Sequence, residues 1–401
     1  MKVEYAYLKE QFAQEDSLTK DILRDITELL RLGQFTLGPW VQKFEQAVCD
    51  KYGVKHCVGV NSGTDALVLS MKALGIGQGD TVLTQPNTFV ATVGAICAVG
   101  ARPMFVDVDD TYQMDLDQAV HRKVKCAIPV HLTGLARDTH GAWPLVINDA
   151  AQAIGASCTV PDNTIFEDRN PLTGITWYGG WTSRKQQSVA NFQHVSCFSL
   201  HPLKNIHVWG DGGFITTNDD NLDKDLRLLR NHGLLDRDTV VVPGINSRLD
   251  SLQAIVGWHM LKKVDEINEQ RRVNAARYDA ALREIPGVVV PPRNPAYYQV
   301  FHTYVLCIQS QRDELIKFMA EKGVEVKIHY AKCLHEQPGL KFLGYRRGDF
   351  PVAEWQADHQ FSLPIHEYLT SNQIDYVIAC IHEFIRGTKE SAPELPPKAG
   401  G

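Results

Sequence analysis

Apolar residues recur at helical spacing in some parts of the chain and form short continuous runs in others. Near the N-terminus the helical spacing is carried by Ile22, Leu23, Ile26, Leu29 and Leu30. It returns after a Gly38-Pro39 elbow, at Val41, Phe44 and Val48. The pattern predicts two helices within residues 1–56, joined at the elbow.

Short apolar runs follow, and each predicts a buried strand. They lie at 57–60, 80–84, 102–107, 126–131, 145–149 and 214–217. Helix-length segments separate most of them, and further helices are predicted at 226–233 and 249–262. Strands that alternate with helices favour the α/β class, with a mostly parallel sheet between two layers of helices.

The last third of the chain has a different pattern. A long polar helix is predicted from about Val264, followed by strands at 304–308 and 324–328 and a one-sided apolar helix at 371–386. These elements predict a smaller α+β domain. We therefore expect a large domain over residues 1–264, a small domain over 265–386, and a disordered Pro- and Gly-rich tail over 387–401.

A polar segment of unusual length interrupts the large domain at about 156–194. It is rich in Asn, Thr, Gly and Ser, and it contains Trp177, Tyr178 and Trp181. Long segments without a clear pattern are commonly functional or mobile. The aromatics favour a flap or a dimer-contact loop, and a surface insertion without a role is the alternative.

Composition narrows the class of protein. The 401 residues carry a net charge of −6, with 22% charged and 44% hydrophobic residues, which gives no bias toward nucleic acid or an anionic membrane. We expect the basic doublets Arg271-Arg272 and Arg346-Arg347 to be solvated faces. No run of about 18 apolar residues predicts a membrane span or a signal peptide. Nine single cysteines without C-x-x-C spacing suit reduced thiols in a cytoplasmic protein.

Lys204 is the first candidate for chemistry. It follows an apolar run and Pro202, and it precedes a glycine-rich turn at Gly210, Gly212 and Gly213. A lysine shielded from water loses part of its preference for the charged form, so its amine becomes a nucleophile toward carbonyl groups. A solvated loop lysine is the alternative.

Three more features of the predicted sheet have both a functional and a structural reading. Gly63 and Thr64 lie between a strand and a helix, where free N–H groups suit a phosphate but also make an ordinary turn. Asp149 ends a strand, where ligands collect in such sheets and where helix caps are also common. Phe89 is either a platform for a planar ring or a core residue.

These residues lie in motifs that resemble the DegT/DnrJ/StrS family of sugar aminotransferases. The matching segments are F-S-L-H-P-L-K-N from Phe198, S-G-T-x-A-L from Ser62, T-F-x-A-T from Thr88, N-D-A-A-Q from Asn148, the segment at 244–254, and H-Y-x-x-x-L-H-x-Q-P from His329. The similarity extends over roughly residues 30–386. It implies the aspartate-aminotransferase fold (fold type I) with a seven-stranded sheet, and the cofactor pyridoxal 5'-phosphate (PLP).

The resemblance also implies roles for single residues around PLP. Lys204 would hold the cofactor as a Schiff base, and Asp149 would pair with its pyridine nitrogen. Phe89 would stack on the ring, and Gln152 would contact its phenolic oxygen. The phosphate would be held by Gly63, Thr64 and Ser199.

Three further residues are implied by the resemblance at the edges of the site. Asn246 would reach the phosphate of the neighbouring subunit, which implies a homodimer with a shared active site. His329 and His335 would approach the substrate. From the residues alone, Asn246 is equally a turn residue and the histidines are equally loop caps, and their spacing does not favour a metal.

The implied reaction transfers the amino group of L-glutamate to a keto sugar, in the biosynthesis of surface polysaccharide, lipopolysaccharide or an antibiotic. The sugar would be a nucleotide-linked keto-deoxysugar or a free sugar acid such as 8-oxo-3-deoxy-manno-octulosonate, the substrate of one subgroup that makes 8-amino-3,8-dideoxy-manno-octulosonate. Two alternatives are a PLP-dependent sugar dehydratase and a non-catalytic binding or regulatory protein. The dehydratases have histidine where this chain has Lys204, and retention of Lys204 and Asp149 disfavours the non-catalytic alternative.

Overall fold

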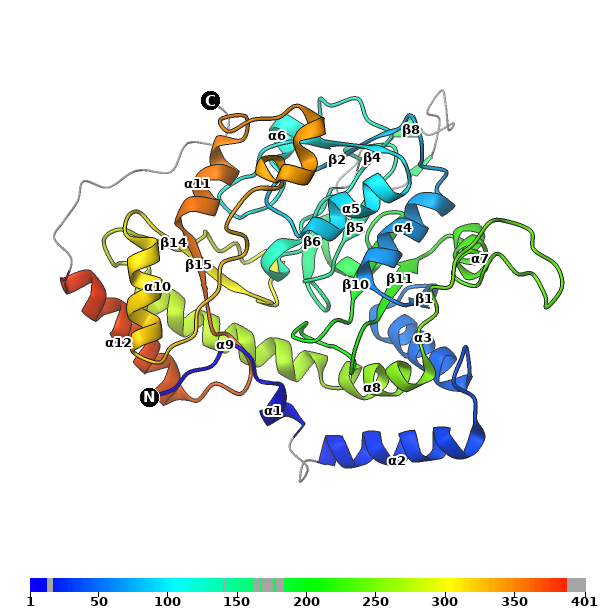
Figure 1. Ribbon diagram of the computed structural model, residues 1–401, viewed down its shortest axis with the longest axis horizontal. Helices are drawn as coiled ribbons and strands as arrows, with labels where there is room; N and C mark the ends of the chain where they lie inside the picture. The colour runs from blue at the N-terminus through cyan, green and yellow to red at the C-terminus, as the bar shows by residue number, and fades with distance from the viewer. Residues whose placement is uncertain (13–16, 140, 162–165, 168–175, 178–183, 388–401) are drawn as a thin grey trace.

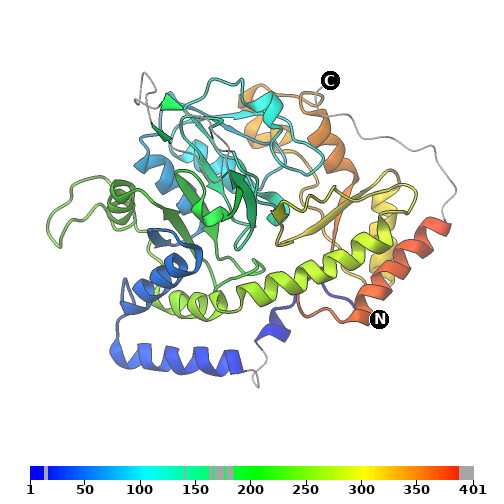
Figure 2. The same ribbon diagram turned by 180° about the vertical axis from the view of Figure 1, so that it is seen from behind.

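The computed structural model describes residues 1–12, 17–139, 141–161, 166–167, 176–177 and 184–387. Apart from Gly387, the tail predicted to be disordered lies outside the described residues. Figures 1 and 2 show the chain from opposite sides.

Both predicted N-terminal helices are present. They are α2 (Ser17–Leu32) and α3 (Pro39–Tyr52), preceded by the short α1 (Leu8–Gln11). Pro39 is tolerated at the first position of α3 because an N–H there has no partner within the helix. Gly53 ends α3 with φ 65°, a conformation that glycine adopts at little cost.

The central sheet has seven strands when two isolated bridges are included. The strands are β1 (His56–Val60), β2 (Thr81–Thr84), β3 (Arg102–Phe105), β4 (Cys126–Ala127), β5 (Ile147–Asp149), β10 (Val195–Ser199) and β11 (Gly213–Thr217). Bridges Ala127–Val146 and Val130–Asp149 join β4 to β5, which gives the order β1-β11-β10-β5-β4-β2-β3. Only β11 runs antiparallel to its neighbours, so the sheet is mostly parallel, as predicted.

Helices cover both faces of this sheet. They are α4 (Gly63–Ala73), α5 (Val90–Ala98), α6 (Leu116–Ala119), α7 (Asp220–Leu229) and α8 (Ser251–Leu261). Successive side chains of a strand point to opposite faces. Cys197 of β10 therefore packs in the cluster with α4 and α7, whereas Phe198 packs in the cluster with α3 and α8.

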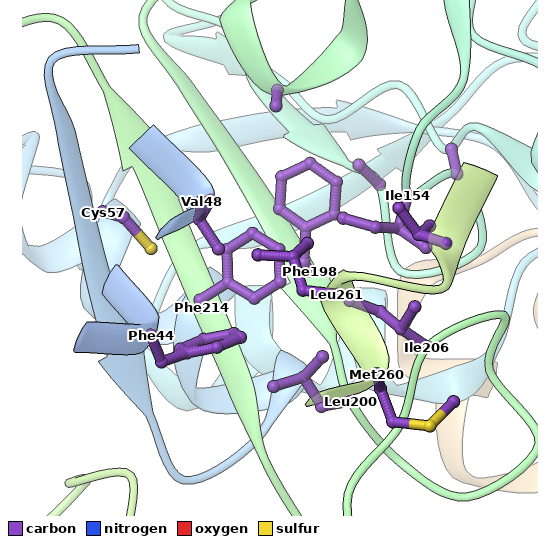
Figure 3. Packing of buried hydrophobic residues seen from close by; sticks show 14 of the residues in the cluster. Phe44, Val48, Cys57, Ile154, Phe198, Leu200, Ile206, Phe214, Met260 and Leu261 are labelled. Carbon is purple, nitrogen blue, oxygen red and sulfur yellow. The ribbon is translucent and has the colours of Figure 1, made fainter. Parts of the chain in front are cut away.

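Aromatic contacts hold the α3 and α8 face (Figure 3). Phe198 stacks on Phe214 of β11, with ring centroids 4.5 Å apart and planes 9° apart. Phe44 of α3 meets Phe214 edge-on at 5.7 Å. Pairs of this kind contribute about 0.5–1.5 kcal/mol each beyond their buried area. They fix β10, whose carboxyl end leads directly to the loop of Lys204.

The C-terminal part has a hydrophobic cluster of its own. Its strands are β12 (Val288–Val289), β14 (Tyr304–Ile308) and β15 (Gln360–Leu363), and its helices are α9 (Val264–Leu282), α10 (Arg312–Glu321), α11 (Pro351–His359) and α12 (Ser371–Gly387). Helix α9 joins the two parts, because Ile267 packs in the cluster of the large sheet and Tyr278 in that of the small one. The domain boundary at residue 264 stays a prediction.

Three predicted elements differ from the structure by more than two residues at an end. The helix predicted at 226–233 begins at Asp220 and ends at Leu229. Strand β4 ends at Ala127 instead of reaching residue 131, because Pro129 has no N–H to donate to a neighbouring strand. Residues 324–328 form only single bridges, from Val324 to Val3 and from Lys327 to Ser362.

The segment 156–194 contains more regular structure than its composition predicts. Strands β6 (Ser157–Pro161) and β9 (Arg184–Ser188) pair antiparallel, and β13 (Tyr297–Tyr298) extends their sheet. A second pair consists of β7 (Phe166–Glu167) and β8 (Thr176–Trp177). Tyr178, Trp181 and the side chain of Trp177 lie outside the described residues, so the predicted role of these aromatics stays a prediction.

Short 3-10 helices complete the chain. They are η1 (Leu132–Gly134), η2 (Val189–Asn191), η3 (Leu334–Glu336) and η4 (Pro338–Leu343). No helix within the described ranges is both long enough and apolar enough to cross a membrane.

Candidate active site

A cavity of about 460 Å³ lies where the carboxyl ends of β5 and β10 meet the start of α4 and the middle of α9. Eight of the ten predicted site residues line it: Gly63, Thr64, Phe89, Asp149, Gln152, Ser199, Lys204 and His329. Residues from five separate motifs are thus brought to one place. Asn246 and His335 do not line the cavity.

Lys204 lies in the turn that follows β10. Its N–H donates to the carbonyl of His201 at 3.1 Å, and Leu203 before it has φ 75°. A left-handed conformation is unfavourable for leucine, so the surrounding structure must hold this turn in place. Burial lowers the pKa of the Lys204 amine to about 8, and the negative charge of Asp149 partly opposes that shift. The amine is therefore easier to deprotonate than an ordinary lysine, as the sequence predicts.

Asp149 is the buried carboxylate of the cavity. Its Oδ2 accepts from the Thr92 hydroxyl at 2.8 Å, and its Oδ1 accepts from the Ala151 N–H at 3.2 Å. Burial raises the pKa of Asp149, whereas these two hydrogen bonds and the charge of Lys204 lower it. The arrangement suits a carboxylate that pairs with a cationic group inside the cavity.

The start of α4 lies against the end of β10. A Cβ atom at Gly63 would lie 2.8 Å from Cβ of Ser199, so only glycine allows this close approach. Ser62 caps the helix by accepting from the Asp65 N–H at 3.0 Å. The N–H groups at the positive end of an 11-residue helix, together with the Ser199 hydroxyl, suit a phosphate.

Phe89 and Gln152 lie on other walls of the cavity. Phe89 immediately precedes α5, and its side chain is 55% exposed, so it is not a core residue. Its ring centroid lies 5.9 Å from that of Tyr330. Gln152 is held by the Thr133 N–H, which donates to its Oε1 at 2.9 Å.

The two predicted substrate histidines have different surroundings. His329 lines the cavity, and its Nδ1 lies 2.8 Å from the hydroxyl of Ser362. Burial lowers the pKa of His329 to about 4, so its imidazole is neutral at physiological pH. His335 is buried away from the cavity, where its Nε2 lies 3.0 Å from Glu354 and its ring meets Phe350 edge-on.

Asn246 is exposed on its own chain. It forms an antiparallel bridge with Asn231, and it follows the segment 234–243, which projects from the body of the chain beyond α7 (Figures 1 and 2). An exposed position is compatible with a contact to a second subunit.

Sequence reasoning missed several residues of the cavity wall. The sequence predicts Arg271 on a solvated face, but it is 1% exposed, lines the cavity and pairs with Glu367 at 3.2 Å. Its place on a helix of mixed polarity conceals the burial. The N-terminal residues Tyr5 and Tyr7 also line the cavity, as do His302, Tyr330 and His366. The lining of the cavity is thus rich in aromatic rings.

Comparison with known proteins decides the family. The model of the DegT/DnrJ/EryC1/StrS aminotransferase family matches residues 16–382. The chain belongs to this family.

Relatives of this DegT-family chain have both enzymatic and regulatory names. A pleiotropic regulatory protein of Geobacillus stearothermophilus is 37% identical over 401 residues, with 96% of this chain and 99% of that protein covered. The dTDP-3-amino-3,4,6-trideoxy-alpha-D-glucose transaminase of Micromonospora megalomicea subsp. nigra is 34% identical over 383 residues, covering 92% and 95%. The UDP-N-acetyl-3-dehydro-alpha-D-glucosamine 3-aminotransferase of Acidithiobacillus ferrooxidans is 34% identical over 381 residues, covering 92% and 95%.

Solved structures show the same fold. DesV of S. venezuelae superposes with a TM-score of 0.86 at 30% identity, covering 97% of this chain and all of that one. NtdA of Bacillus subtilis, solved with its bound cofactor PMP, gives a TM-score of 0.81 at 25% identity, covering 96% and 85%. The predictions of the family, of fold type I, of PLP dependence and of a sugar aminotransferase are confirmed.

The residues around the cavity fit PLP. A glycine-lined helix start next to a serine hydroxyl suits the phosphate, a buried carboxylate suits a cationic ring nitrogen, and an exposed phenylalanine ring suits a planar face. The amine of Lys204 lies in the same cavity, where it suits covalent attachment to an aldehyde.

Proposed function

We propose that this aminotransferase moves the amino group of L-glutamate to the keto group at carbon 3 of a nucleotide-linked sugar. The observation that carries the proposal is the joint placement of Lys204, Asp149 and the Gly63 turn in one cavity. The choice of carbon 3 is supported by the names of two relatives, which refer to a 3-amino and a 3-dehydro nucleotide sugar. A third relative, in Pseudomonas aeruginosa, is named for a 3-oxo nucleotide sugar.

In this proposal the cofactor is held by groups at three places. The N–H groups of Gly63 and Thr64 and the hydroxyl of Ser199 bind its phosphate. Asp149 binds its ring nitrogen, and Thr92 favours the ionised carboxylate by donating to Oδ2. Phe89 would stack on the face of the ring, and Gln152 would contact its phenolic oxygen. When bound, PLP supplies an aldehyde and a ring that stabilises negative charge beside the reacting amino group.

Lys204 has two tasks in this proposal. Its Nζ binds the cofactor between reactions, and after glutamate displaces it the neutral amine takes the proton from the alpha carbon of the amino acid. A pKa of about 8 leaves roughly one tenth of the free amine neutral at pH 7. The same group then returns a proton to the carbon that becomes the amine-bearing carbon of the sugar.

The imidazoles on the substrate side act as neutral hydrogen-bonding groups. The pKa of His329 and that of His366 are lowered to about 4 by burial, and burial also lowers the pKa of His302 well below its usual range. Neutral imidazoles donate and accept hydrogen bonds, which suits the hydroxyl groups of a sugar. We assign His329 to sugar binding, and we assign His335 to packing around Glu354.

The proposed active site is shared by two chains of a homodimer. Asn246 lies beside a projecting segment in which Leu235 is 64% and Val240 is 63% exposed, and apolar side chains on such a segment favour contact with a partner. In the dimer, Asn246 would bind the phosphate in the site of the partner subunit.

The alternatives fit the residues less well. A dehydratase of this family has histidine at the position of Lys204, and a purely regulatory protein has no need of a lysine with a lowered pKa beside a buried carboxylate. The free octulosonate acid is less supported than a nucleotide sugar, because three of the relatives named above are named for nucleotide sugars. The nine cysteines are all free thiols, which suits the proposed cytoplasmic location.

A panel of keto sugars tests the substrate. Purified protein is incubated with PLP, L-glutamate and one acceptor at a time: a 3-keto nucleotide sugar, a 4-keto nucleotide sugar or 8-oxo-3-deoxy-manno-octulosonate. The amino sugar and 2-oxoglutarate are then quantified by mass spectrometry. We expect the highest kcat/KM with the 3-keto nucleotide sugar. A preference for the free acid or for the 4-keto sugar would overturn the assignment of carbon 3.

A further inference from the structure

The N-terminal strap, which we define as residues 3–12, connects the small C-terminal sheet to the loop of Lys204. Figures 1 and 2 show this segment beside α9, ahead of α2. At its first end, the Val3 N–H donates to the carbonyl of Gly323 at 2.9 Å, and the Glu325 N–H donates to the carbonyl of Val3 at 2.9 Å. The first end of the strap is thus hydrogen-bonded to the small C-terminal part of the protein, after α10.

The second end of the strap contacts the segment that follows Lys204. Gln11 accepts a hydrogen bond from Nε2 of His207 at 2.5 Å, and burial lowers the pKa of His207 to about 4, so the ring is a neutral donor. Phe12 meets the rings of His207 and Trp209 edge-on, at 5.5 and 5.4 Å. Both ends of the strap are therefore fixed by specific contacts.

Tyr7 lies between these ends and reaches the cavity. It is 2% exposed, and its ring stacks on that of His366 with centroids 5.1 Å apart. Its hydroxyl accepts from Nη2 of Arg271 at 2.9 Å and donates to the backbone carbonyl of Lys204 at 3.4 Å. One hydroxyl thus links a buried guanidinium to the main chain of the proposed catalytic lysine.

Arg271 itself is fully engaged by protein groups. Its Nε donates to Glu367 at 3.2 Å, and its Nη1 donates to the carbonyls of Phe301 and His302 at 3.4 and 3.3 Å. Each of its three nitrogens therefore has a partner in the protein. This disfavours Arg271 as the group that binds a substrate carboxylate, and it favours a role in holding Tyr7.

The turn of Lys204 requires such support on both sides. Leu203 has the unfavourable φ of 75°, and conformations of this kind cost about 1–3 kcal/mol and persist only where surrounding contacts offset that cost. Directly after Lys204 in the chain, the buried side chain of Asn205 donates to Asn268 at 2.7 Å and to the carbonyl of Val300 at 2.9 Å. At Lys204 itself, the hydroxyl of Tyr7 donates a hydrogen bond to the backbone carbonyl.

We propose that Tyr7 is a positioning residue for Lys204: its hydroxyl bridges the carbonyl of Lys204 to Arg271, and the N-terminal strap thereby fixes the turn that places the amine in the cavity. This inference rests on the proposed function, in which Lys204 carries the cofactor and transfers the proton. Small displacements of a catalytic group are costly, since a shift of about 1 Å can lower a rate by about a hundredfold.

The substitution Tyr7→Phe tests the hydroxyl and keeps the ring with its stacking contact. We expect kcat with L-glutamate to fall by about ten- to a hundredfold, while KM for L-glutamate changes by less than about twofold. A second readout uses the cofactor-free protein. Acetylation of the Lys204 amine as a function of pH, followed by mass spectrometry, gives the midpoint for its deprotonation. A looser turn admits water, so we expect this midpoint to rise in Tyr7→Phe.

Tyr376→Phe is the matched control, because the hydroxyl of Tyr376 on α12 donates to the carbonyl of Lys322 at 2.9 Å, remote from the cavity. Circular dichroism and melting temperature establish that both variants are folded. An effect in Tyr7→Phe alone supports the inference. If the two variants respond equally, or if Tyr7→Phe matches the wild type, the inference is overturned. Failure of the proposed function is distinguishable, since the wild type would then show no PLP absorption that L-glutamate changes.

Discussion

The hydroxyl oxygen of Thr92 lies 2.8 Å from Oδ2 of Asp149, across the junction between α5 and the end of β5. Thr92 is itself held by Thr88, whose hydroxyl oxygen lies 2.9 Å away. A hydrogen bond to a carboxylate favours the ionised form, and this contact therefore counteracts the rise in the pKa of Asp149 that burial causes. An ionised Asp149 is required if it is to bind a cationic ring nitrogen.

Thr92→Val tests this contact. Loss of the donor raises the pKa of Asp149 further, because the hydrogen bond from Thr92 favours the ionised carboxylate. The carboxylate then needs a higher pH to ionise, so the acid limb of the kcat profile moves to higher pH and the affinity for PLP falls. Thr92→Ser keeps the hydroxyl and serves as the control. An unchanged acid limb in Thr92→Val would contradict the assignment.

Lys204→Met is expected to stabilise the cofactor-free protein. The pKa of Lys204 is about 8 in the folded state against 10.5 as its ordinary value, so between these two values the unfolded chain binds more protons and folding stability rises with pH. Below pH 8 Lys204 is protonated in the folded wild type, so the free-energy cost of burying its charge lowers the stability in full. The variant is therefore more stable than the wild type by about 1–2 kcal/mol at pH 7, and by less at pH 9.5. Urea denaturation at both pH values measures the difference, with Lys332→Met at an exposed position as the control. An equal difference in unfolding free energy between Lys204→Met and the wild type at both pH values would refute the prediction.

His335 and His329 are expected to respond differently to substitution. His335→Ala removes a buried ring from Phe350 and leaves Glu354 without its imidazole partner, which costs about 2–4 kcal/mol of folding free energy. KM for the keto sugar should stay within about twofold of the wild type. His329→Ala should instead raise that KM severalfold with a smaller loss of stability. Steady-state kinetics and thermal melting of both variants give the comparison, and a raised KM in His335→Ala would restore it as a substrate residue.

Mixed dimers test the shared active site. Lys204→Ala and Asn246→Ala are each expected to have little activity as homodimers. When they are unfolded and refolded together in equal amounts, half of the dimers are hybrids, and each hybrid contains one site with both native residues. Activity should then recover to about a quarter of the wild-type value. Absence of recovery would show that Lys204 and Asn246 act in the site of the same chain.

The sequence predicts the large sheet well because its signals are local. A strand such as His56–Val60, followed by a glycine turn and a capped helix, is specified within about 15 residues, and the same short motif positions Gly63. β4 is shorter than predicted because one proline removes a donor, an effect that the apolar run conceals. Residues 324–328 have the composition of a strand but pair only singly.

The other wall of the cavity was not predictable in this way. Tyr7 and Arg271 are 264 residues apart, and Arg271 and Glu367 are 96 residues apart. Neither Tyr7 in a short polar segment nor Arg271 on a polar helix shows a local sign of burial. Their roles follow from tertiary contacts, which no periodicity in a single sequence reports.

The reaction of the PLP-loaded protein with L-glutamate alone, followed by visible absorption, tests most directly whether this protein is an aminotransferase that uses Lys204. We expect glutamate to bleach the band of the lysine-bound cofactor in the wild type and to yield one 2-oxoglutarate per bleached cofactor, and we expect neither change in Lys204→Ala. A wild-type protein that binds no PLP, or whose absorption stays constant with every amino donor, would contradict the role of Lys204 in a PLP-dependent aminotransferase.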